Sequence, residues 1–469
     1  MKKSGRIGLT VLAFALLTAA GCIKQEDSYK ISGSVILHEN SAGAAASVKI
    51  YRTENFPGVL EQYKAAYPQT GAELSQAWYF DHRRHNPVKT GGCSSDGSFE
   101  LDGLEEGYYI LTALAEGFGW IYSEEFYLKS NKKLGTFNLY PETSVNALME
   151  QDQTWSSGRH YLITVPVTVY QGVKLTIEPG VWIRLAGSSA KLTVLGEIQA
   201  EGTSEAWIRF TTAEESGEPV SWWKILLSED TDTSSFFHYV LIEYALNGIS
   251  LNNGKTRMEE TVLREASNGI SILTNSSTEI NHCLVYDCYV GIDVSSTIEL
   301  EASVIFNCTS SGVTVSQHNG TITGSIISGC GTGIGENYVD NLHINHCLIE
   351  NNTLGLYYEA GAEGHMTLSY SNIVGNTERG LFCRVDAYPA ISYCNIDNDS
   401  MNICLEGQPS GSEYLQSGNI DAFNCYWGTT DIEEIHSTIY DGFTAGSHPL
   451  LGEVHFQPFA LEEIIGAGP

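Results

Sequence analysis

The feature that most constrains the fold of this chain is a repeat of about 22 residues in its second half. A glycine followed by an aliphatic residue recurs at spacings of 21, 22, 21, 21, 22 and 25 residues. The glycines are Gly248, Gly269, Gly291, Gly312, Gly333, Gly355 and Gly380. A fixed period of this length is typical of stacked units that each cover the apolar face of the next. The second half is therefore expected to be a solenoid rather than a globular domain.

Two further sets of aliphatic residues recur at the same spacing, and we call each set a column. One consists of Ile242, Leu263, Val285, Ile305, Ile327, Ile349, Ile373 and Ile396, and the other of Ile280, Leu300, Ile322, Ile344, Leu368 and Ile391. No stretch shows a sustained helical period, and the repeat is too short for a strand-helix-strand unit. Three short strands per coil, with coils stacked at about 4.8 Å, fit this period. We predict an all-β right-handed parallel β-helix, with these inward positions after the glycines: Leu251, Ile272, Val294, Val315, Tyr358, Cys383 and Leu405. Glu336 falls in the same column, but a lone buried carboxylate is costly, so a local bulge is expected to turn it outward.

Small residues form two further columns in which cysteine exchanges with Ser, Ala or Asn. The first holds Cys283, Ser303, Ser325, Cys347, Ser371 and Cys394, and the second holds Ala245, Ala266, Cys288, Cys308, Cys330, Asn352, Asn376 and Asp399. Because these positions accept any small residue, we expect buried free thiols, with a bridge among Cys288, Cys308 and Cys330 as the alternative. Asn352 and Asn376 are expected to form a short asparagine ladder.

Residues 1–21 resemble a bacterial lipoprotein signal peptide. A basic start precedes an apolar run that ends in Ala19-Ala-Gly-Cys22, and this run is shorter than the roughly 20 residues of a bilayer span. The resemblance implies that Cys22 is lipidated, that 22–27 is a linker, and that the lipid is the only membrane anchor. Ile23 stands where inner-membrane lipoproteins carry Asp, which implies the outer membrane, facing the periplasm or the cell surface. An ordinary cleaved signal with a free Cys22 thiol is the alternative.

Residues 28–140 alternate like short strands between glycine turns. Ser95-Asp-Gly-Ser-Phe99, followed by Leu104 and Tyr108, is similar to the hallmark of carboxypeptidase regulatory-like (transthyretin-like) domains, which implies a β-sandwich over 28–140. An insert at 52–92 interrupts the resemblance and holds the basic cluster 81–85. We expect a solvated loop tip that pairs with nearby acids, with docking of an acidic sugar or partner as the alternative.

The ends of the repeat resemble bacterial right-handed β-helix proteins with the pectate-lyase-like fold. Leu175-Thr-Ile-Glu-Pro-Gly-Val181 matches their opening coils, and Asn424-Cys-Tyr-Trp-Gly428 followed by 452–458 matches their ending. The resemblance places the β-helix at 141–460 and a C-terminal tail at 461–469. It implies no single activity, since the fold hosts lyases, polygalacturonases, epimerases, tailspikes and non-catalytic adhesins.

The charge of the chain limits its ligands. The 25 Lys and Arg against 56 Asp and Glu leave a net charge of −31, which excludes nucleic acid because such binding needs basic clusters. The same repulsion disfavours acidic polysaccharides and leaves neutral glycans, proteins or calcium-bridged partners. The Asn-Thr-Asp, Asp-Asp and Gly-His-Gly signatures of polygalacturonases are absent. We therefore predict no catalytic residues, no resident metal and no cofactor, with calcium held by Asp386, Asp397 and Asp399 beside Arg384 as the exception.

The coils after Gly355 lengthen and gather aromatic and acidic residues on one flank. The candidate ligand-binding residues are Tyr357, Tyr358, Glu359, Arg384, Asp386, Tyr388, Tyr393 and Asp397. Aromatic rings beside carboxylates suit the apolar faces and hydroxyls of sugars. Our hypothesis is a monomeric, outer-membrane or surface-anchored lipoprotein whose β-helix binds carbohydrate or another surface polymer without turnover. A polysaccharide lyase or glycoside hydrolase on the same flank and a structural or adhesive spacer are the alternatives.

Overall fold

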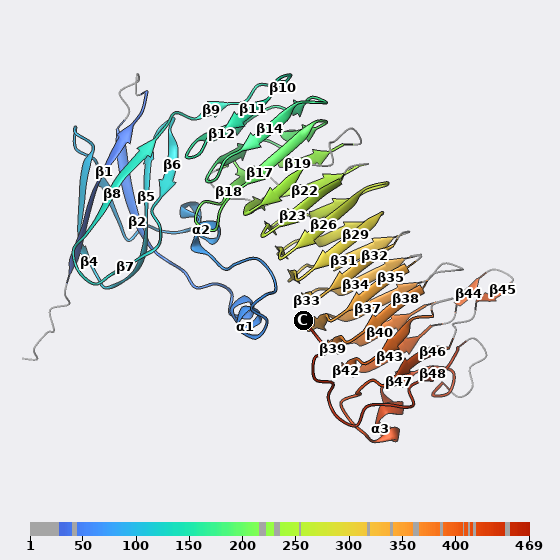
Figure 1. The fold of residues 1–469 in the computed structure, drawn as a ribbon. Coiled ribbons are helices and arrows are strands. Elements are labelled where there is room, and N and C mark those ends of the chain that lie inside the picture. The colour runs from blue at the N-terminus through green and yellow to red at the C-terminus, as the bar shows by residue number, and fades with distance from the viewer. Residues whose placement is uncertain are drawn as a thin grey trace, which may run out of the picture.

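The computed structural model describes residues 28–39, 45–214, 222–228, 235–252, 255–316, 319–337, 341–359, 365–384, 388–406, 408–410, 413–415, 419–445 and 451–469. Cys22 and Asp386 lie outside these ranges. Over them the chain forms an N-terminal all-β unit followed by a long parallel β-solenoid (Figure 1). The helical segments are short: α1 (Gly58–Ala66), α2 (Gln76–Tyr79), the 3-10 turn η1 (His82–Arg84) and α3 (Ile432–Ser437). Within the described ranges, no helix has the length and apolarity that a membrane crossing requires.

The N-terminal unit consists of two small sheets around one apolar core. One sheet has the order β4 (Ser98–Leu104), β1 (Tyr29–Leu37) and β8 (Lys132–Leu139). The other contains β3 (Lys89–Gly92), β2 (Ala46–Arg52), β5 (Gly107–Ala115), β6 (Gly119–Tyr122) and β7 (Phe126–Leu128). Ile31, Phe99 and Leu111 from both sheets share the buried core. Gly97 has φ +82° in the turn before β4, where a Cβ atom would lie 2.3 Å from the Val35 carbonyl oxygen, so this turn requires glycine.

The solenoid repeats three strands per coil, and each strand joins one of three parallel sheets. The first sheet contains β9 (Thr143–Ser144), β12 (His160–Ile163), β15 (Trp182–Leu185), β18 (Ile208–Thr212), β21 (Val240–Glu243), β24 (Val262–Arg264), β27 (Leu284–Tyr286), β30 (Val304–Phe306), β33 (Ile326–Ser328), β36 (Leu348–Glu350), β39 (Asn372–Val374) and β42 (Asn395–Asp397). The second contains β10 (Leu148–Met149), β13 (Val167–Val169), β16 (Lys191–Val194), β19 (Trp222–Leu227), β22 (Ala245–Leu251), β25 (Asn268–Ile272), β28 (Val290–Val294), β31 (Ser311–Ser316), β34 (Thr332–Asn337), β37 (Leu354–Glu359), β40 (Arg379–Cys383), β43 (Met401–Leu405) and β47 (Ile439–Tyr440). The third contains β11 (Gln153–Trp155), β14 (Lys174–Ile177), β17 (Glu197–Glu201), β20 (Phe236–His238), β23 (Lys255–Glu259), β26 (Ser277–Asn281), β29 (Thr297–Glu301), β32 (Gly320–Thr323), β35 (Asn341–Asn345), β38 (His365–Ser369), β41 (Ala390–Ser392), β46 (Ile420–Phe423) and β48 (Val454–His455). A hairpin of β44 (Gln408–Ser410) and β45 (Glu413–Leu415) stands apart from them.

The predicted parallel solenoid is confirmed, and the aliphatic columns lie inside it. All described residues of the three predicted inward columns are buried, and register partners such as Ile305 and Ile327 lie opposite one another in neighbouring coils. The side chain of Glu336 lies outside the described set. In seven successive coils, from Tyr239 to Gly375, two of the three corners turn on a single residue with positive φ, such as His346 and Asn351. These sharp corners explain why the period stays close to 22 residues.

The small-residue columns fill the corners of the solenoid. All ten cysteines in the described ranges are free, and every one except Cys93 is buried. Asn376 donates through Nδ2 to the Asn398 Oδ1 atom at 2.7 Å and accepts from Asn352 Nδ2 at 3.1 Å. Asn398 in turn donates to Asn402 Oδ1 at 3.0 Å. The asparagine ladder therefore continues through Asn398 and not through Asp399, which corrects the predicted column by one residue.

The insert between β2 and β3 covers the outer face of the first sheet. Leu60, Tyr63 and Trp78 share one buried cluster with an outward aliphatic column of that sheet. This column is Leu241, Val262, Leu284, Val304, Ile326 and Leu348. The Trp78 ring lies 6.0 Å from that of Trp207, and the Tyr63 hydroxyl donates to Ser328 Oγ at 2.6 Å. The expectation of a solvated loop is wrong, because the insert carries enough apolar surface to pack on the solenoid. The expected pairing of the basic cluster with nearby acids is confirmed, as by Arg84 with Glu265 and His85 with Glu54.

The C-terminal residues cover the same face where the insert ends. Asn372 and Asn395 continue the outward column of the first sheet, and the backbone of the tail bonds to both. Asn372 Nδ2 donates to the Ala467 carbonyl oxygen at 3.1 Å, and Ile464 N–H donates to Asn395 Oδ1 at 2.8 Å. The outward column of the first sheet is aliphatic where the apolar side chains of the insert cover it. It changes to asparagine where the backbone of the C-terminal tail covers it, because that backbone needs hydrogen-bond partners.

Candidate functional site

The residues predicted on the C-terminal flank come together only in part. Tyr357 donates to Glu359 Oε2 at 2.5 Å, and Arg384 reaches the Tyr357 hydroxyl at 3.1 Å, Glu359 at 3.3 Å and Glu406 at 3.0 Å. These four side chains form a ladder on the outer face of the second sheet. Their polar groups are engaged with one another, so the ladder is a self-satisfied network rather than an open site.

The other predicted flank residues point elsewhere. Tyr358 is fully buried inside the solenoid, which removes it from any surface site. Tyr393 lies at the corner between the third and first sheets, where it stacks on Tyr370 with ring centroids 5.1 Å apart. Asp397 is on β42 of the first sheet, and Tyr388 is exposed before β41. Sequence proximity did not place these side chains together, because each coil turns its strands toward three different faces.

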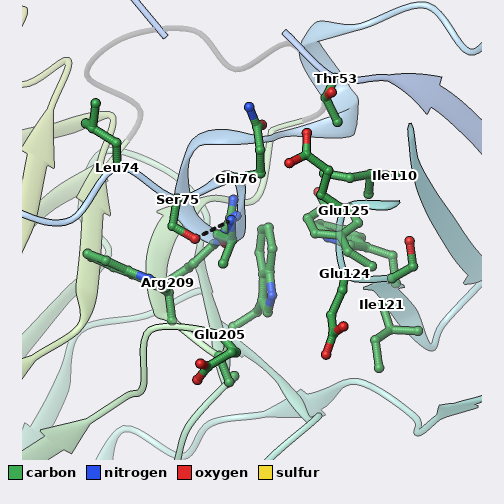
Figure 2. A pocket seen from close by; sticks show the side chains of 18 of the residues that line it. Thr53, Leu74, Ser75, Gln76, Ile110, Ile121, Glu124, Glu125, Glu205 and Arg209 are labelled. Carbon is green, nitrogen blue, oxygen red and sulfur yellow. Dashed lines mark hydrogen bonds between the residues drawn. The ribbon is translucent and has the colours of Figure 1, made fainter. Parts of the chain in front are cut away.

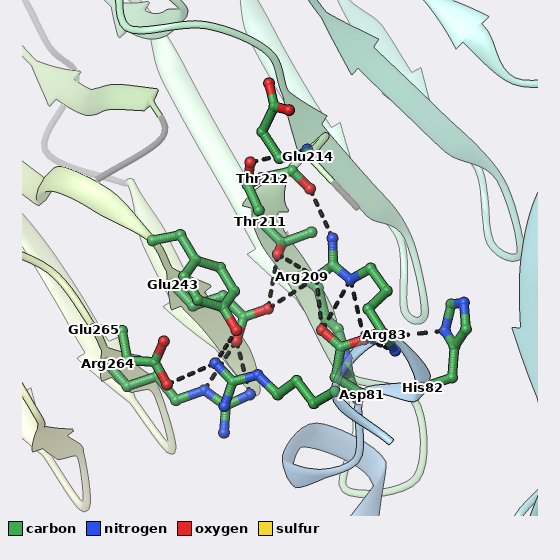
Figure 3. A network of polar contacts seen from close by, with 12 residues as sticks. Asp81, His82, Arg83, Arg209, Thr211, Thr212, Glu214, Glu243, Arg264 and Glu265 are labelled. Carbon is green, nitrogen blue, oxygen red and sulfur yellow. Dashed lines mark hydrogen bonds and ion pairs between the residues drawn. The ribbon is translucent and has the colours of Figure 1, made fainter. Parts of the chain in front are cut away.

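The basic cluster of the insert packs against the first sheet in a network of ion pairs, in which Arg83 is buried and Arg84 is partly exposed (Figure 3). Arg83 binds Asp81 Oδ2 at 2.6 Å and lies 3.5 Å from Glu243 Oε1. Arg264 binds Glu243 Oε2 at 2.7 Å. Burial opposes ionisation of Glu243, but Arg264 and Arg83 outweigh it and lower its pKa. The network therefore fastens the insert to the solenoid.

A cavity of about 830 Å³ lies where the N-terminal unit, the insert and the first coils of the solenoid meet (Figure 2). Its walls come from 53–56 and 74–77 of the insert, from β5, β6 and the segment after β6, and from solenoid residues near 160, 180 and 207. Aromatic side chains form much of the lining: Phe56, Tyr108, Trp120, Tyr122, Trp182 and Trp207. We name this cavity the junction pocket. It has the size and mixed lining of small-ligand sites.

Some residues that line the junction pocket carry buried polar atoms without a partner. Among the described residues, six buried side-chain N or O atoms make no hydrogen bond, and three of them belong to residues that line this pocket. They are Gln76 Oε1, Trp120 Nε1 and His160 Nδ1. Gln76 donates through Nε2 to the Glu54 carbonyl oxygen at 2.7 Å, which leaves its Oε1 as a free acceptor. Orphaned buried polar groups are rare in proteins, and a ligand or water that pairs with them is one explanation.

The imidazole of His160 is held neutral at this junction. Its Nε2 lies 2.6 Å from the Trp120 carbonyl oxygen, so Nε2 carries the proton and Nδ1 is an acceptor. The ring stacks on Trp182 with centroids 5.8 Å apart. Burial lowers the pKa of His160 to about 3, so the ring carries no charge at neutral pH.

Acidification is expected to loosen the junction, because both His160 and His82 are buried in the neutral form. Burial lowers the pKa of His82 from 6.5 to about 4, against the attraction of Asp81. Between these values the unfolded chain binds more protons than the folded chain, so the free energy of unfolding decreases as the pH falls through 6.5. At pH 5 the loss from His82 alone is about 2 kcal/mol.

Urea unfolding at pH 7 and pH 5 measures this effect. His82→Gln should lose about 2 kcal/mol less than the wild type between the two pH values. His365→Gln serves as the control, since His365 is exposed on β38 and its replacement removes no buried imidazole. Equal losses in wild type and His82→Gln would contradict the burial argument.

Comparison with known proteins finds a family model within the solenoid and a similar solved structure. The family model of the right-handed β-helix region matches residues 225–364 and 295–426. A crystal structure of a mutant periplasmic alginate epimerase is similar at 10% identity, covering 67% of this chain and 78% of that chain with a TM-score of 0.29. A similarity this weak carries no argument about activity. The comparison with curated proteins gives no match.

The strand topology and the family-model match define a right-handed parallel β-solenoid preceded by N-terminal antiparallel strands. The junction pocket was not predicted from the sequence. Its lining comes from segments between residues 53 and 209 that only meet in the folded chain. One signal was available: the residue before each inward aliphatic of the first sheet is also aliphatic from Leu241 to Leu348. An outward apolar column requires a cover, and the apolar 56–80 segment was the candidate for it.

Proposed function

We propose that this protein is a lipid-anchored lipoprotein of the bacterial outer membrane that binds carbohydrate without turning it over, and that the junction pocket is its binding site. The observation that carries the proposal is the lining of this pocket. Aromatic faces lie beside carboxylates, an amide and unpartnered buried polar atoms. Sugars present apolar C–H faces and hydroxyl groups, which such a lining accommodates together.

The anchor and the location rest on Cys22 and the segment before it, whose sequence resembles a lipoprotein signal. A lipid at Cys22 would tether the N-terminal unit close to the membrane and leave the solenoid as the distal part. The mode of action is proposed to be binding, because the polar ladder on the C-terminal flank is paired internally. A lyase or hydrolase and a structural spacer remain the competing functions.

Substitution of an exposed tyrosine tests the site directly. Tyr108→Ala in the junction pocket should weaken binding of a glycan by about tenfold, the effect of losing one aromatic face. Tyr388→Ala on the C-terminal flank should leave it unchanged. The two side chains are 58% and 48% exposed, so neither substitution is expected to disturb folding. Affinities are measured by isothermal titration calorimetry with oligosaccharides selected from a glycan array.

The outcomes separate the functions. Loss of binding in Tyr388→Ala with none in Tyr108→Ala would move the site to the C-terminal flank. Release of reducing ends or unsaturated products from the selected oligosaccharides would overturn the non-catalytic proposal in favour of an enzyme. If the protein binds no glycan on the array, the proposal of carbohydrate binding is overturned and the structural spacer is favoured.

A further inference from the structure

The ionisable side chains that line the junction pocket are mostly acidic. Five carboxylates line it: Glu54, Glu61, Glu124, Glu125 and Glu205. Figure 2 shows Glu124, Glu125 and Glu205 among the side chains that line the pocket. Glu54 Oε1 lies 3.1 Å from His85 Nδ1, and the other four carboxylates have no basic partner within the ranges that the structure describes. Their charge is therefore available to a ligand.

The basic residues of the lining do not balance these carboxylates. Arg209 is 1% exposed, and its guanidinium donates to the Phe80 carbonyl oxygen at 2.9 Å and to the Ala77 carbonyl oxygen at 2.5 Å. Its Cζ atom also lies 4.3 Å from the centroid of the Trp182 ring. Arg209 is thus enclosed by the protein, and His160 is neutral. Among the described residues that line the pocket, an anionic ligand would find no free cation.

Two of the three unpartnered atoms, on His160 and Gln76, are acceptors and favour a ligand that donates hydrogen bonds, whereas the third, Trp120 Nε1, is itself a donor. His160 is 3% exposed and its Nδ1 is an acceptor, and Gln76 Oε1 is an acceptor as well. Neither atom has a donor among the described residues. A protonated amine supplies three N–H donors and a positive charge, and aromatic rings attract such a cation through their faces. Carboxylates, acceptors and aromatic faces all match this one group.

We propose that the ligand of the junction pocket carries a protonated amino group, so that the preferred glycans contain sugars with a free amine. This inference rests on the proposed function and narrows it to one class of carbohydrate. The pocket would disfavour uronates, whose carboxylates meet five like charges. It would also distinguish a free amine from its N-acetyl form, because acetylation removes the charge and two of the three donors.

Three tetrasaccharides of equal length test the inference by calorimetry with the full chain: a glucosamine, an N-acetylglucosamine and a glucose β-1,4 tetramer. At about pH 6 the amines are protonated and the glutamates ionised. The glucosamine tetramer should bind at least about tenfold more tightly than the other two, and increasing salt should weaken only its binding. Spermidine is the fourth probe and reports amine recognition without a sugar.

Charge-neutralising variants locate the effect. Glu124→Gln/Glu125→Gln should reduce the affinity for the glucosamine tetramer about fivefold and leave that for the glucose tetramer unchanged. Glu279→Gln/Glu299→Gln is the matched control, because these neighbouring carboxylates lie on the outer face of the third sheet. It should change neither affinity, although it removes the same charge from the chain.

Each result decides between the two proposals. Equal affinities for the three tetramers, or equal effects of the two double variants, would overturn the amine inference and leave carbohydrate binding in place. Binding of spermidine without any tetramer would support amine recognition and overturn the carbohydrate function. Binding of none of the four probes would overturn the inference, and the glycan array then decides the proposed function separately.

Discussion

Glu243→Gln is expected to lower the free energy of unfolding by about 3–5 kcal/mol, because it leaves buried cations without their counter-charge. Glu243 is fully buried and binds Arg264, whose side chain is 1% exposed. It also lies 3.5 Å from Arg83 of the insert and accepts a hydrogen bond from Thr211 at 2.7 Å. Gln keeps the size of the side chain, so the loss reports charge rather than packing.

The matched control is Glu259→Gln. Glu259 pairs with Arg257 at the same distance of 2.7 Å, but this pair is partly exposed on the third sheet, with side chains 30% and 52% accessible. Solvent screens such pairs, and their removal costs about 1 kcal/mol or less. Urea unfolding followed by tryptophan fluorescence measures both variants, since Trp78 and Trp207 lie close to the network. A loss in Glu243→Gln no larger than that in Glu259→Gln would refute the buried-network argument.

The same variant should also loosen the insert. Segment 53–88 is held by the ion network at η1 and by the apolar contacts of α1 and α2. Weakening the network lowers the free energy of local opening, and proteolysis follows the population of the open form. Limited proteolysis of Glu243→Gln should therefore cleave this segment before the solenoid. Cleavage at the wild-type rate would indicate that the apolar contacts alone hold it.

Asn376→Leu is expected to destabilise the solenoid by about 3 kcal/mol or more, because several buried groups lose their partners at once. Asn376 is fully buried, and its Oδ1 atom accepts from the backbone N–H and the Nδ2 atom of Asn352, both at 3.1 Å. Its Nδ2 atom donates to the Ile349 carbonyl oxygen at 3.1 Å and to Asn398 at 2.7 Å. Leu has a similar shape but neither donor nor acceptor.

An exposed asparagine pair provides the control for this ladder. Asn341 Nδ2 donates to Asn319 Oδ1 at 3.1 Å, also between neighbouring coils, but at the surface. Water replaces this bond when it is lost, so Asn341→Leu should cost less than about 1 kcal/mol. Thermal and urea unfolding compare the two variants. Similar losses in both would show that the ladder contributes only as a small-residue column.

The interior of the solenoid could be predicted because it repeats. In a parallel β-helix the inward residue of each strand stacks on its equivalent one coil away, so a period near 22 residues appears directly in the sequence. Ile305, Ile327 and Ile349 show this stacking. The shift from Asp399 to Asn398 in the ladder shows the limit: where loops lengthen, alignment by spacing slips by one residue.

The prediction that the flank residues form one binding site was only partly correct, because the strands of a coil face three directions. Tyr357 and Tyr358 are adjacent in sequence, yet one faces solvent and the other lies inside the solenoid, as the period of two in a strand requires. Sequence distance also separates residues that the fold joins. Trp120, Trp182 and Trp207 line one pocket although they come from β6, β15 and the segment before β18.

The sequence by itself determined the parallel solenoid, its inward columns and the asparagine ladder, because these depend on contacts between residues one period apart. Only the tertiary structure decided that the insert packs on the first sheet, that Arg83 of its basic cluster is buried there, and that a pocket forms at the junction. These features depend on contacts across as many as about 290 residues, such as that of Tyr63 with Glu350. No local sequence pattern predicts such a contact, because the two residues are separated by unrelated sequence. They come together only when the insert packs on the solenoid.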